Sequence, residues 1–337
     1  MLTKPEIAEL GKIIDAAERP FVFFHDDPDG LASFLLLYRK IQVGKGYPLK
    51  AAPQLTMDYA RLTADYGADT VIILDIAMAD QDFLDALHLP TVWVDHHQLQ
   101  KPKNVLYLNP QVRKKNIPTP ALLWPLARKE DLWIATVGCV GDWHVPSFAK
   151  ECKKQYPYLF GKKMTVQDLL FNSNLGILAR VFSFCLKGST SDVNTNVKIF
   201  TRIQDPKEIL EQTTPQGKYI WRYYSKINVH YEKLREEALK SVKDDPLLVF
   251  TYGDDKLSLT KDLANELLAL HPDKIIVLGR RKSGEVRCSL RSGPKINVRD
   301  KLMNALTKVD GRGGGHEQAC GCAIKEDDFE RFLDELR

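Results

Sequence analysis

The amino-acid sequence predicts an α/β protein with a parallel-sheet N-terminal domain, a helical connector and a smaller C-terminal α/β domain. Short apolar runs alternate with helical segments in the first part of the chain, strand signals then fade, and they return after residue 246. Strands separated by helical segments form βαβ units, whose strands lie parallel. A chain of 337 residues is also too long for one compact core. We therefore expect domains over residues 1–150, 151–240 and 241–337.

Each predicted strand of the first domain is a short apolar run: PFVFF at 20–24, TVIILDIA at 70–77 and PTVWVDHH at 90–97. Such runs are typical of strands that are buried on both faces of a parallel sheet. The segments 31–41 and 80–89 have the apolar spacing of helices. This alternation predicts a parallel sheet with helices between its strands.

The connector and the last domain follow from where strand signals stop and resume. Segments 165–188 and 215–242 look helical, and SVKDDP at 241–246 has the composition of a break between domains. The alternating pattern then returns, with strands predicted at 247–252, 274–281 and 285–292 and helices at 261–270 and 296–306. This second α/β region is smaller than the first.

Composition and charge limit the class of protein. Hydrophobic residues make up 44% and charged residues 27% of the chain, as in ordinary soluble domains, and no apolar run is long enough to cross a membrane. Acidic residues interrupt segment 1–20, which predicts an amphipathic helix instead of a signal peptide and hence a cytoplasmic protein. The net charge of +4 permits an anionic partner without requiring one. Six cysteines with one close pair, Cys320 and Cys322, indicate reduced thiols and no disulfide framework.

Acidic and histidine side chains follow all three predicted strands of the first domain. They are His25, Asp27 and Asp29 after the first strand, Asp75 after the second, and Asp95, His96 and His97 after the third. Because ligands bind beyond the carboxyl ends of parallel strands, we expect these residues to share one edge of the sheet. A later helical segment supplies Asp142, which we expect to complete the set.

This combination of carboxylates and imidazoles predicts a site for two divalent cations. The ligand types suit Mn²⁺, Fe²⁺ or Zn²⁺ better than a soft metal held by thiolates. Five aspartates with two or three histidines exceed what one ion needs, whereas two ions that share a carboxylate would use them. Such ions lie about 3.5–4 Å apart and clamp the attacking and leaving oxygens of a phosphoryl displacement. DPDG alone is a common turn, and a strand-end aspartate often caps a helix, but three successive strand ends favour a metal site.

Four segments of the first domain resemble, in order, the motifs of the DHH phosphoesterase superfamily. They are HDDPDG at 25–30, the strand-end Asp75, DHH at 95–97 and GD at 141–142. CSLRS at 288–292 and GGGHEQACGC at 313–322 resemble the companion DHHA1 domain. The DHH tripeptide alone is a weak signal, whereas the ordered set with a C-terminal GGGH is a strong one. One residue separates His25 from Asp27, a spacing that resembles RecJ-like exonucleases, particularly the archaeal ones; the nanoRNases are close relatives.

The resemblance implies a role for each matching residue. His25 and Asp27 would hold one metal ion, Asp29, His96 and Asp142 the second, and Asp75 would bridge them, while Asp95 would orient the histidines and His97 would act as general acid or donor at the phosphate. The catalytic group would thus comprise Asp75, Asp95 and His97. Two Mn²⁺ ions are expected, with Mg²⁺ or Co²⁺ as substitutes. Asp26 remains an alternative ligand in this first motif.

The C-terminal domain contains residues suited to binding an anion. Consecutive exposed N–H groups of a glycine-rich segment can hold a phosphate, and an arginine adds a fork of donors. A plain flexible turn is the alternative for a glycine run taken by itself. The predicted substrate-binding residues are Ser289, Arg291, Gly313, Gly314, Gly315 and His316.

The sequence therefore predicts a two-metal phosphodiesterase, an exonuclease that releases mononucleotides from single-stranded DNA or RNA. The alternatives are a nanoRNase or pAp phosphatase for very short oligonucleotides, a polyphosphate or pyrophosphate hydrolase, and a replication scaffold of the Cdc45 type. The complete set of acids and histidines counts against the scaffold, and GGGH against the polyphosphate enzyme. The expected partner is single-stranded nucleic acid or a short oligonucleotide, with no membrane; a replication or repair protein and a second copy of the chain are further candidates.

Overall fold

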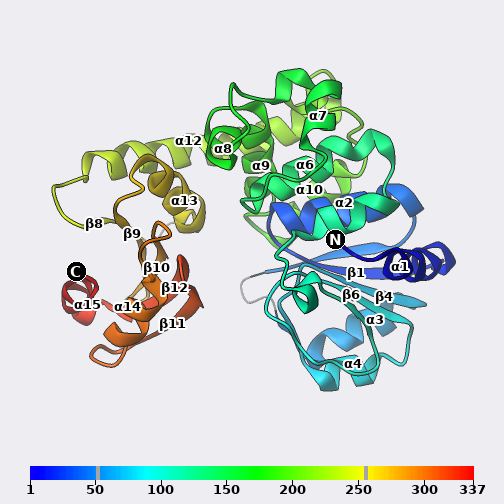
Figure 1. The fold of residues 1–337 in the computed structure, drawn as a ribbon, viewed down its shortest axis with the longest axis horizontal. Coiled ribbons are helices and arrows are strands. Elements are labelled where there is room, and N and C mark those ends of the chain that lie inside the picture. The colour runs from blue at the N-terminus through cyan, green and yellow to red at the C-terminus, as the bar shows by residue number, and fades with distance from the viewer. Residues whose placement is uncertain (51–53, 254–256) are drawn as a thin grey trace. The chain divides into compact units, whose positions relative to one another are not determined.

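The computed structural model describes residues 1–50, 54–253 and 257–337. The chain forms two compact units, residues 1–224 and 225–337 (Figure 1). Each unit has its own five-stranded sheet and its own buried apolar core. The predicted α/β class, with a parallel-sheet domain followed by a smaller α/β domain, is confirmed.

The sheet of the first unit consists of five parallel strands in the order β2-β1-β4-β6-β7. They are β1 (Pro20–His25), β2 (Lys45–Leu49), β4 (Thr70–Leu74), β6 (Thr91–Val94) and β7 (Leu106–Leu108). In the ladder Phe24 lies opposite Leu74, and Leu74 lies opposite Val94. The carboxyl ends of the three central strands therefore lie side by side.

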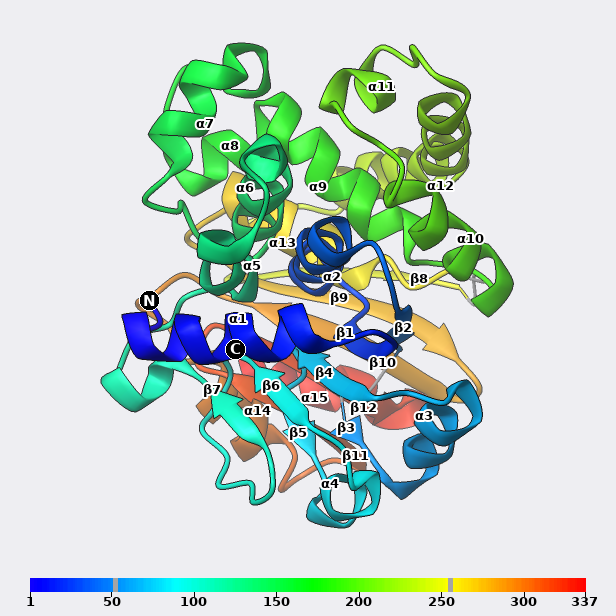
Figure 2. The same cartoon turned by 90° about the vertical axis from the view of Figure 1, so that its right-hand side faces the viewer.

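This sheet lies between two helical layers (Figure 2). One layer contains α1 (Lys4–Ala16) and α2 (Pro28–Ile41), and the other contains α3 (Ala60–Tyr66) and α4 (Gln81–Leu87). Successive side chains of β1 point to opposite layers: Phe23 packs against Phe83 of α4, whereas Phe24 stacks on Phe34 of α2. Because both faces are covered, the three central strands are apolar and buried along almost their whole length.

Further helices complete the first unit. They are α5 (Thr119–Leu123), α6 (Leu132–Gly141), α7 (Ala149–Gln155), α8 (Val166–Phe171), α9 (Asn174–Cys185), α10 (Thr190–Phe200) and α11 (Pro206–Leu210), with a small parallel pair of strands, β3 (Gln54–Leu55) and β5 (Met78–Ala79). Helix α12 (Pro215–Lys240) crosses the division at residue 224, so the helices of the expected connector are shared between the two units. No helix among the described residues is long and apolar enough to span a membrane.

The second unit has a mixed sheet in the order β11-β12-β10-β9-β8. Strands β8 (Leu247–Tyr252) and β9 (Ile275–Lys282) are parallel, whereas β10 (Glu285–Arg291), β12 (Ala319–Lys325) and β11 (Gly311–His316) continue the sheet in antiparallel fashion. Helices α14 (Val298–Ala305) and α15 (Phe329–Leu336) pack on one face, and α13 (Thr260–Leu270) lies on the other (Figure 1). The three strands predicted for this region are present.

Candidate metal centre and substrate site

The predicted metal ligands meet at the carboxyl ends of the central strands. His25 is the last residue of β1, Asp75 follows β4 directly, and His96 follows β6 by two residues. Asp75 has a left-handed backbone with φ 57°, which aspartate tolerates better than most residues. Two helix ends complete the ring, with Asp27 as the N-cap of α2, Asp29 in its first turn and Asp142 as the C-cap of α6.

Asp75 lies between two histidines. Nδ1 of His25 is 3.4 Å from one carboxylate oxygen, and Nε2 of His96 is 3.3 Å from the other. The side chain of Asp75 is only 1% exposed, and neither oxygen has a partner of hydrogen-bond geometry among the described residues. Burying an ionised carboxylate without hydrogen bonds costs folding free energy unless a nearby positive charge compensates it. The arrangement therefore fits a carboxylate that is shared between two cations.

The first group of donor atoms adjoining Asp75 comes from the first motif. Oδ2 of Asp27 is 3.1 Å from Nδ1 of His25, and these two residues form a donor group with Asp75. Oδ1 of the alternative ligand Asp26 is 3.8 Å from Nε2 of the same histidine. The predicted ligands of the first metal ion are thus brought together.

The second donor group lies on the other side of Asp75. Nε2 of His96 is 3.7 Å from Oδ2 of Asp29 and 3.7 Å from Oδ2 of Asp142. Within each group the donor atoms lie within 4.8 Å of one another. Oxygen and imidazole ligands in two adjoining groups fit the predicted pair of divalent cations.

His97 borders the same centre and is held by Asp95. With Asp75 and His96 it forms a third donor group. Its Nδ1 is 2.7 Å from Oδ1 of Asp95, and its backbone N–H donates to Oδ2 of the same carboxylate at 3.0 Å. The orienting contact expected of Asp95 is therefore made with His97, whereas Nδ1 of His96 contacts Oδ1 of Asn116 at 2.7 Å.

Burial and mutual charge shift the pKa values at this centre. Burial raises the pKa of Asp29 well above its usual value, and the Asp75 carboxylate adds to the effect. Burial alone would lower the pKa of His96, but the carboxylates of Asp75 and Asp29 outweigh it and raise this pKa to about 11. Asp27 and Asp75 raise the pKa of His25 in the same way, against its burial. Protons on the histidines thus supply the positive charge that bound cations would replace.

Asn109, which the sequence analysis did not single out, connects the DHH segment to the strand beside it. Its Nδ2 donates to Oδ2 of Asp95 at 3.2 Å, to the backbone oxygen of His97 at 3.0 Å and to the hydroxyl of Tyr107 at 2.8 Å. Its Oδ1 accepts from the backbone N–H of Gln111 at 2.9 Å. Asn109 therefore fixes the carboxylate that orients His97.

Three further polar residues hold the ligands of the second donor group. Ser33 donates to Oδ1 of Asp29 at 3.3 Å, the backbone N–H of Thr119 donates to Oδ2 at 3.2 Å, and Asn116 contacts His96. Ser33 lies four residues after Asp29 on the same helix, and this spacing is a signal that the sequence does contain. Thr119 and Asn116 come from a distant segment, so their role follows only from the fold.

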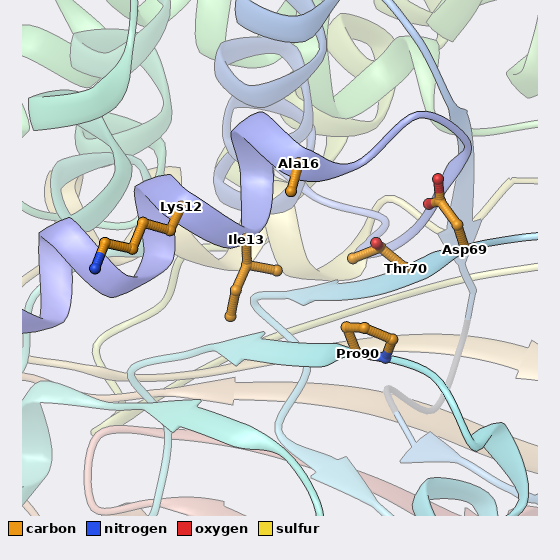
Figure 3. A pocket seen from close by; sticks show the side chains of 6 residues that line it. All are labelled: Lys12, Ile13, Ala16, Asp69, Thr70 and Pro90. Atoms are coloured by element: carbon orange, nitrogen blue, oxygen red, sulfur yellow. The ribbon is translucent and has the colours of Figure 1, made fainter.

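The cavity in Figure 3 lies at the amino-terminal ends of the strands, because Thr70 begins β4 and Pro90 precedes β6. The acidic cluster lies at their carboxyl ends. The volume of the cavity is about 320 Å³, and it is lined by Lys12, Ile13, Ala16, Asp69, Thr70 and Pro90. None of the predicted site residues borders it. The candidate centre is therefore defined by its side chains and not by this cavity.

In the second unit, Ser289 and Arg291 point to the face of β10 that carries α13. The hydroxyl of Ser289 donates to Oγ1 of Thr260 at 2.9 Å, and Nε of Arg291 donates to Oδ1 of Asn265 at 2.6 Å. Nη1 of Arg291 also donates to the backbone oxygen of Leu290 at 2.8 Å. Burial lowers the pKa of Arg291 to about 10, so its guanidinium stays charged at neutral pH.

The GGG segment belongs to the edge strand β11, so the alternative of a plain flexible turn does not apply. Gly313 lies opposite Cys322 of β12, and a Cβ at Gly313 would come within 2.6 Å of Cys322 Cβ. Gly315 has φ 145°, a backbone conformation that residues other than glycine rarely adopt. These glycines therefore permit close strand pairing, and their role in binding an anion stays a prediction.

Strand register decides which predicted substrate-binding residues share a face. His316 lies opposite Ala319, and Ala319 lies opposite Arg291. Residues directly opposite in a ladder project to the same side, so the arginine and the histidine flank a small residue on one face. The next row contains Ser289, Gly321 and Gly314 on this same face. Gly313 and Gly315 belong to the alternate rows.

Comparisons with known proteins support the family resemblance. Residues 223–337 match the DHHA1 domain family. No curated protein sequence gave a significant match. The fold resembles RecJ from Thermus thermophilus in complex with Mn²⁺, with a TM-score of 0.68 and 17% identity, over 98% of this chain and 53% of that one. This chain thus spans about half the length of that RecJ.

Two shorter structures are similar over nearly their whole length. An exonuclease RecJ bound to manganese has a TM-score of 0.62 and 17% identity, with coverage of 98% of this chain and 92% of that one. The DHH domain of a protein described as a member of a ribosomal protein family has a TM-score of 0.65 and 15% identity, with coverage of 99% and 90%. Such identities establish the fold. Residues 223–337 thus match the DHHA1 domain family, and the whole chain has the fold of these RecJ and DHH-domain structures.

Proposed function

We propose that the protein is a metal-dependent phosphodiesterase that removes mononucleotides from an end of single-stranded DNA or RNA. The observation that carries the proposal is Asp75, a buried carboxylate without hydrogen bonds from described residues, between two groups of metal-type donors. Two cations that share a carboxylate suit phosphoryl displacement. RecJ structures of the same fold are described with Mn²⁺ and with Mg²⁺, which supports Mn²⁺ as the first ion to test.

The side chains of the first unit would hold the cations and move a proton. His25 and Asp27 would bind one ion, Asp29, His96 and Asp142 the other, and Asp75 both. Bound cations would stabilise negative charge on the reacting phosphate and activate water for attack. We assign proton donation to the leaving oxygen to Nε2 of His97, because Asp95 engages its other ring nitrogen.

The second unit would bind the terminal nucleotide. Arg291 offers a charged guanidinium that its contacts with Asn265 and Leu290 hold in place, Ser289 a hydroxyl and His316 an imidazole, all on one face of the sheet. Gly314 and Gly321 lie between them, and a Cβ at Gly314 would have no atom within 4 Å. The backbone of this face is therefore open to close approach by a sugar or a phosphate.

The test is a digestion time course in Mn²⁺ with single strands of about two, five and twenty nucleotides, labelled at either end. The proposal predicts stepwise release of mononucleotides from the long strands, and the label position then gives the polarity. An Asp75→Asn preparation, purified in parallel, controls for contaminating nucleases. Cleavage confined to the shortest oligomers would replace the exonuclease with an oligonucleotide scavenger. No cleavage by a protein with bound Mn²⁺ would indicate another phosphoester or a scaffold.

A further inference from the structure

The sheet face that carries Arg291 continues as a row of arginines. Arg287 lies four residues earlier on β10 and, by the two-residue period of a strand, points to the same side. In the ladder Arg287 lies opposite Arg280 of β9 and Ala323 of β12, and Ala323 lies opposite Arg312 of β11. Side chains in one row share a face. Three arginines therefore form one row across four strands.

The next row adds two lysines and one acid. Glu285 of β10 lies opposite Lys282 of β9 and Lys325 of β12. Its carboxylate pairs with Nη1 of Arg312 at 2.6 Å and lies 3.4 Å from Nη2 of Arg287. We call the five cations of these two rows, Arg280, Lys282, Arg287, Arg312 and Lys325, the basic face. Among the described residues, Glu285 within the rows and Asp310 beside Lys325 oppose these five cations, which leaves an excess of positive charge.

The basic face is accessible to a large partner. The side chains of Arg287, Arg312 and Lys325 are 48%, 68% and 64% exposed. Lys325 also pairs with Asp310, which precedes β11. Arg287 lies about 13 Å along β10 from Arg291, as the rise per residue of a strand dictates. A polyanion held at Arg291 by its end would reach the basic face only if it continued beyond the terminal nucleotide.

We propose that the basic face binds the backbone of a single nucleic-acid strand beyond its terminal nucleotide. The inference rests on the proposed function, and the complementary charge of a phosphate backbone selects this occupant. A dinucleotide has one internucleotide phosphate and engages the terminal site alone. The basic face therefore favours strands of several nucleotides over the shortest substrates.

Binding of a labelled oligo(dT) of about twelve nucleotides, measured by fluorescence anisotropy in EDTA over a range of NaCl concentrations, tests this surface. For the double variant Arg287→Gln/Arg312→Gln we expect about tenfold weaker binding near physiological salt. The slope of log K against log salt should decrease by about 0.7 for each phosphate that the variant no longer neutralises. The matched control is Arg281→Gln, because Arg281 is the neighbour of Arg280 on β9, points to the opposite face and pairs with Glu326. The control should bind like the wild type.

Unchanged affinity and salt slope in the double variant would overturn the proposal, and so would an equal loss in Arg281→Gln. In Mn²⁺, the double variant should cleave a dinucleotide with wild-type KM and a long strand with raised KM. An equal rise for both substrates would also overturn it, because the arginines would then act on the terminal nucleotide. If the wild type binds oligo(dT) through this face but releases no mononucleotide, the proposed function fails and the surface assignment stands.

Discussion

The two candidate sites of this protein are built in opposite ways. At the metal centre, charged side chains from the ends of parallel strands are packed together, and Asp75 and His96 are almost fully buried. On the second unit, the proposed binding residues project from neighbouring strands onto one face of the sheet, where Arg312 is 68% exposed. Buried charges interact strongly with one another, whereas water weakens the interactions between exposed charges. Substitutions should therefore have large effects at the first site and graded effects at the second.

The largest effect is expected for Asp75→Asn, because one substitution removes the carboxylate that lies between the two donor groups and would bind both ions. We expect kcat/KM for strand cleavage to fall by at least about a thousandfold, or roughly 4 kcal/mol of transition-state stabilisation. Steady-state kinetics in Mn²⁺ measure this loss. Asp85→Asn, at an exposed aspartate of α4, is the control and should retain full activity. Substantial residual activity of Asp75→Asn would contradict the proposal that Asp75 is a ligand of both ions.

Asp95→Asn tests the link between His97 and its orienting carboxylate. The amide keeps the shape but no longer stabilises a protonated His97, so kcat should fall by about a hundredfold. Mn²⁺ affinity, measured by titration calorimetry, should change much less, because the contact is made to His97 and not to His96. A loss of Mn²⁺ binding that accounts for the whole loss of activity would instead place Asp95 among the ligands.

A smaller effect of a different kind is expected at Arg291. The variant Arg291→Gln loses the charged fork but not the metal centre, so KM should rise by about tenfold while kcat stays nearly constant. Kinetics on a dinucleotide isolate this site from the basic face. A fall in kcat with unchanged KM would show that Arg291 contributes to the chemical step. It would contradict the proposal that the second unit binds substrate while the first unit carries out the chemistry.

The smallest effects concern stability along β11. A Cβ at Gly313 would meet Cβ of Cys322 at 2.6 Å, whereas one at Gly314 would meet nothing within 4 Å. We expect Gly313→Ala to destabilise the protein by about 1–3 kcal/mol and Gly314→Ala to be nearly neutral. Thermal unfolding of the two variants in parallel measures the difference. Equal Tm values would contradict the strand register on which the shared face depends.

Sequence reasoning succeeded where one short segment determines both a strand and its end. The buried runs before His25, Asp75 and His96 identified the central strands, and parallel pairing then dictated that their ends meet. Asn109 and Asn116 were not found, because they lie in segments without periodicity and matter only through distant partners. The edge strand that contains Gly313–Gly315 was not predicted, since glycine composition alone does not distinguish a turn from a closely paired edge strand.

Two cations that share Asp75 would bind as a pair, and the number of Mn²⁺ ions per chain measures this. Titration calorimetry on the metal-free protein, checked by elemental analysis after dialysis, counts the ions per chain. We expect two Mn²⁺ per wild-type chain and a weakened pair in Asp75→Asn, since Asp75 lies between the two donor groups and would be a ligand of both ions. One ion per chain, or two that bind equally well without Asp75, would contradict it.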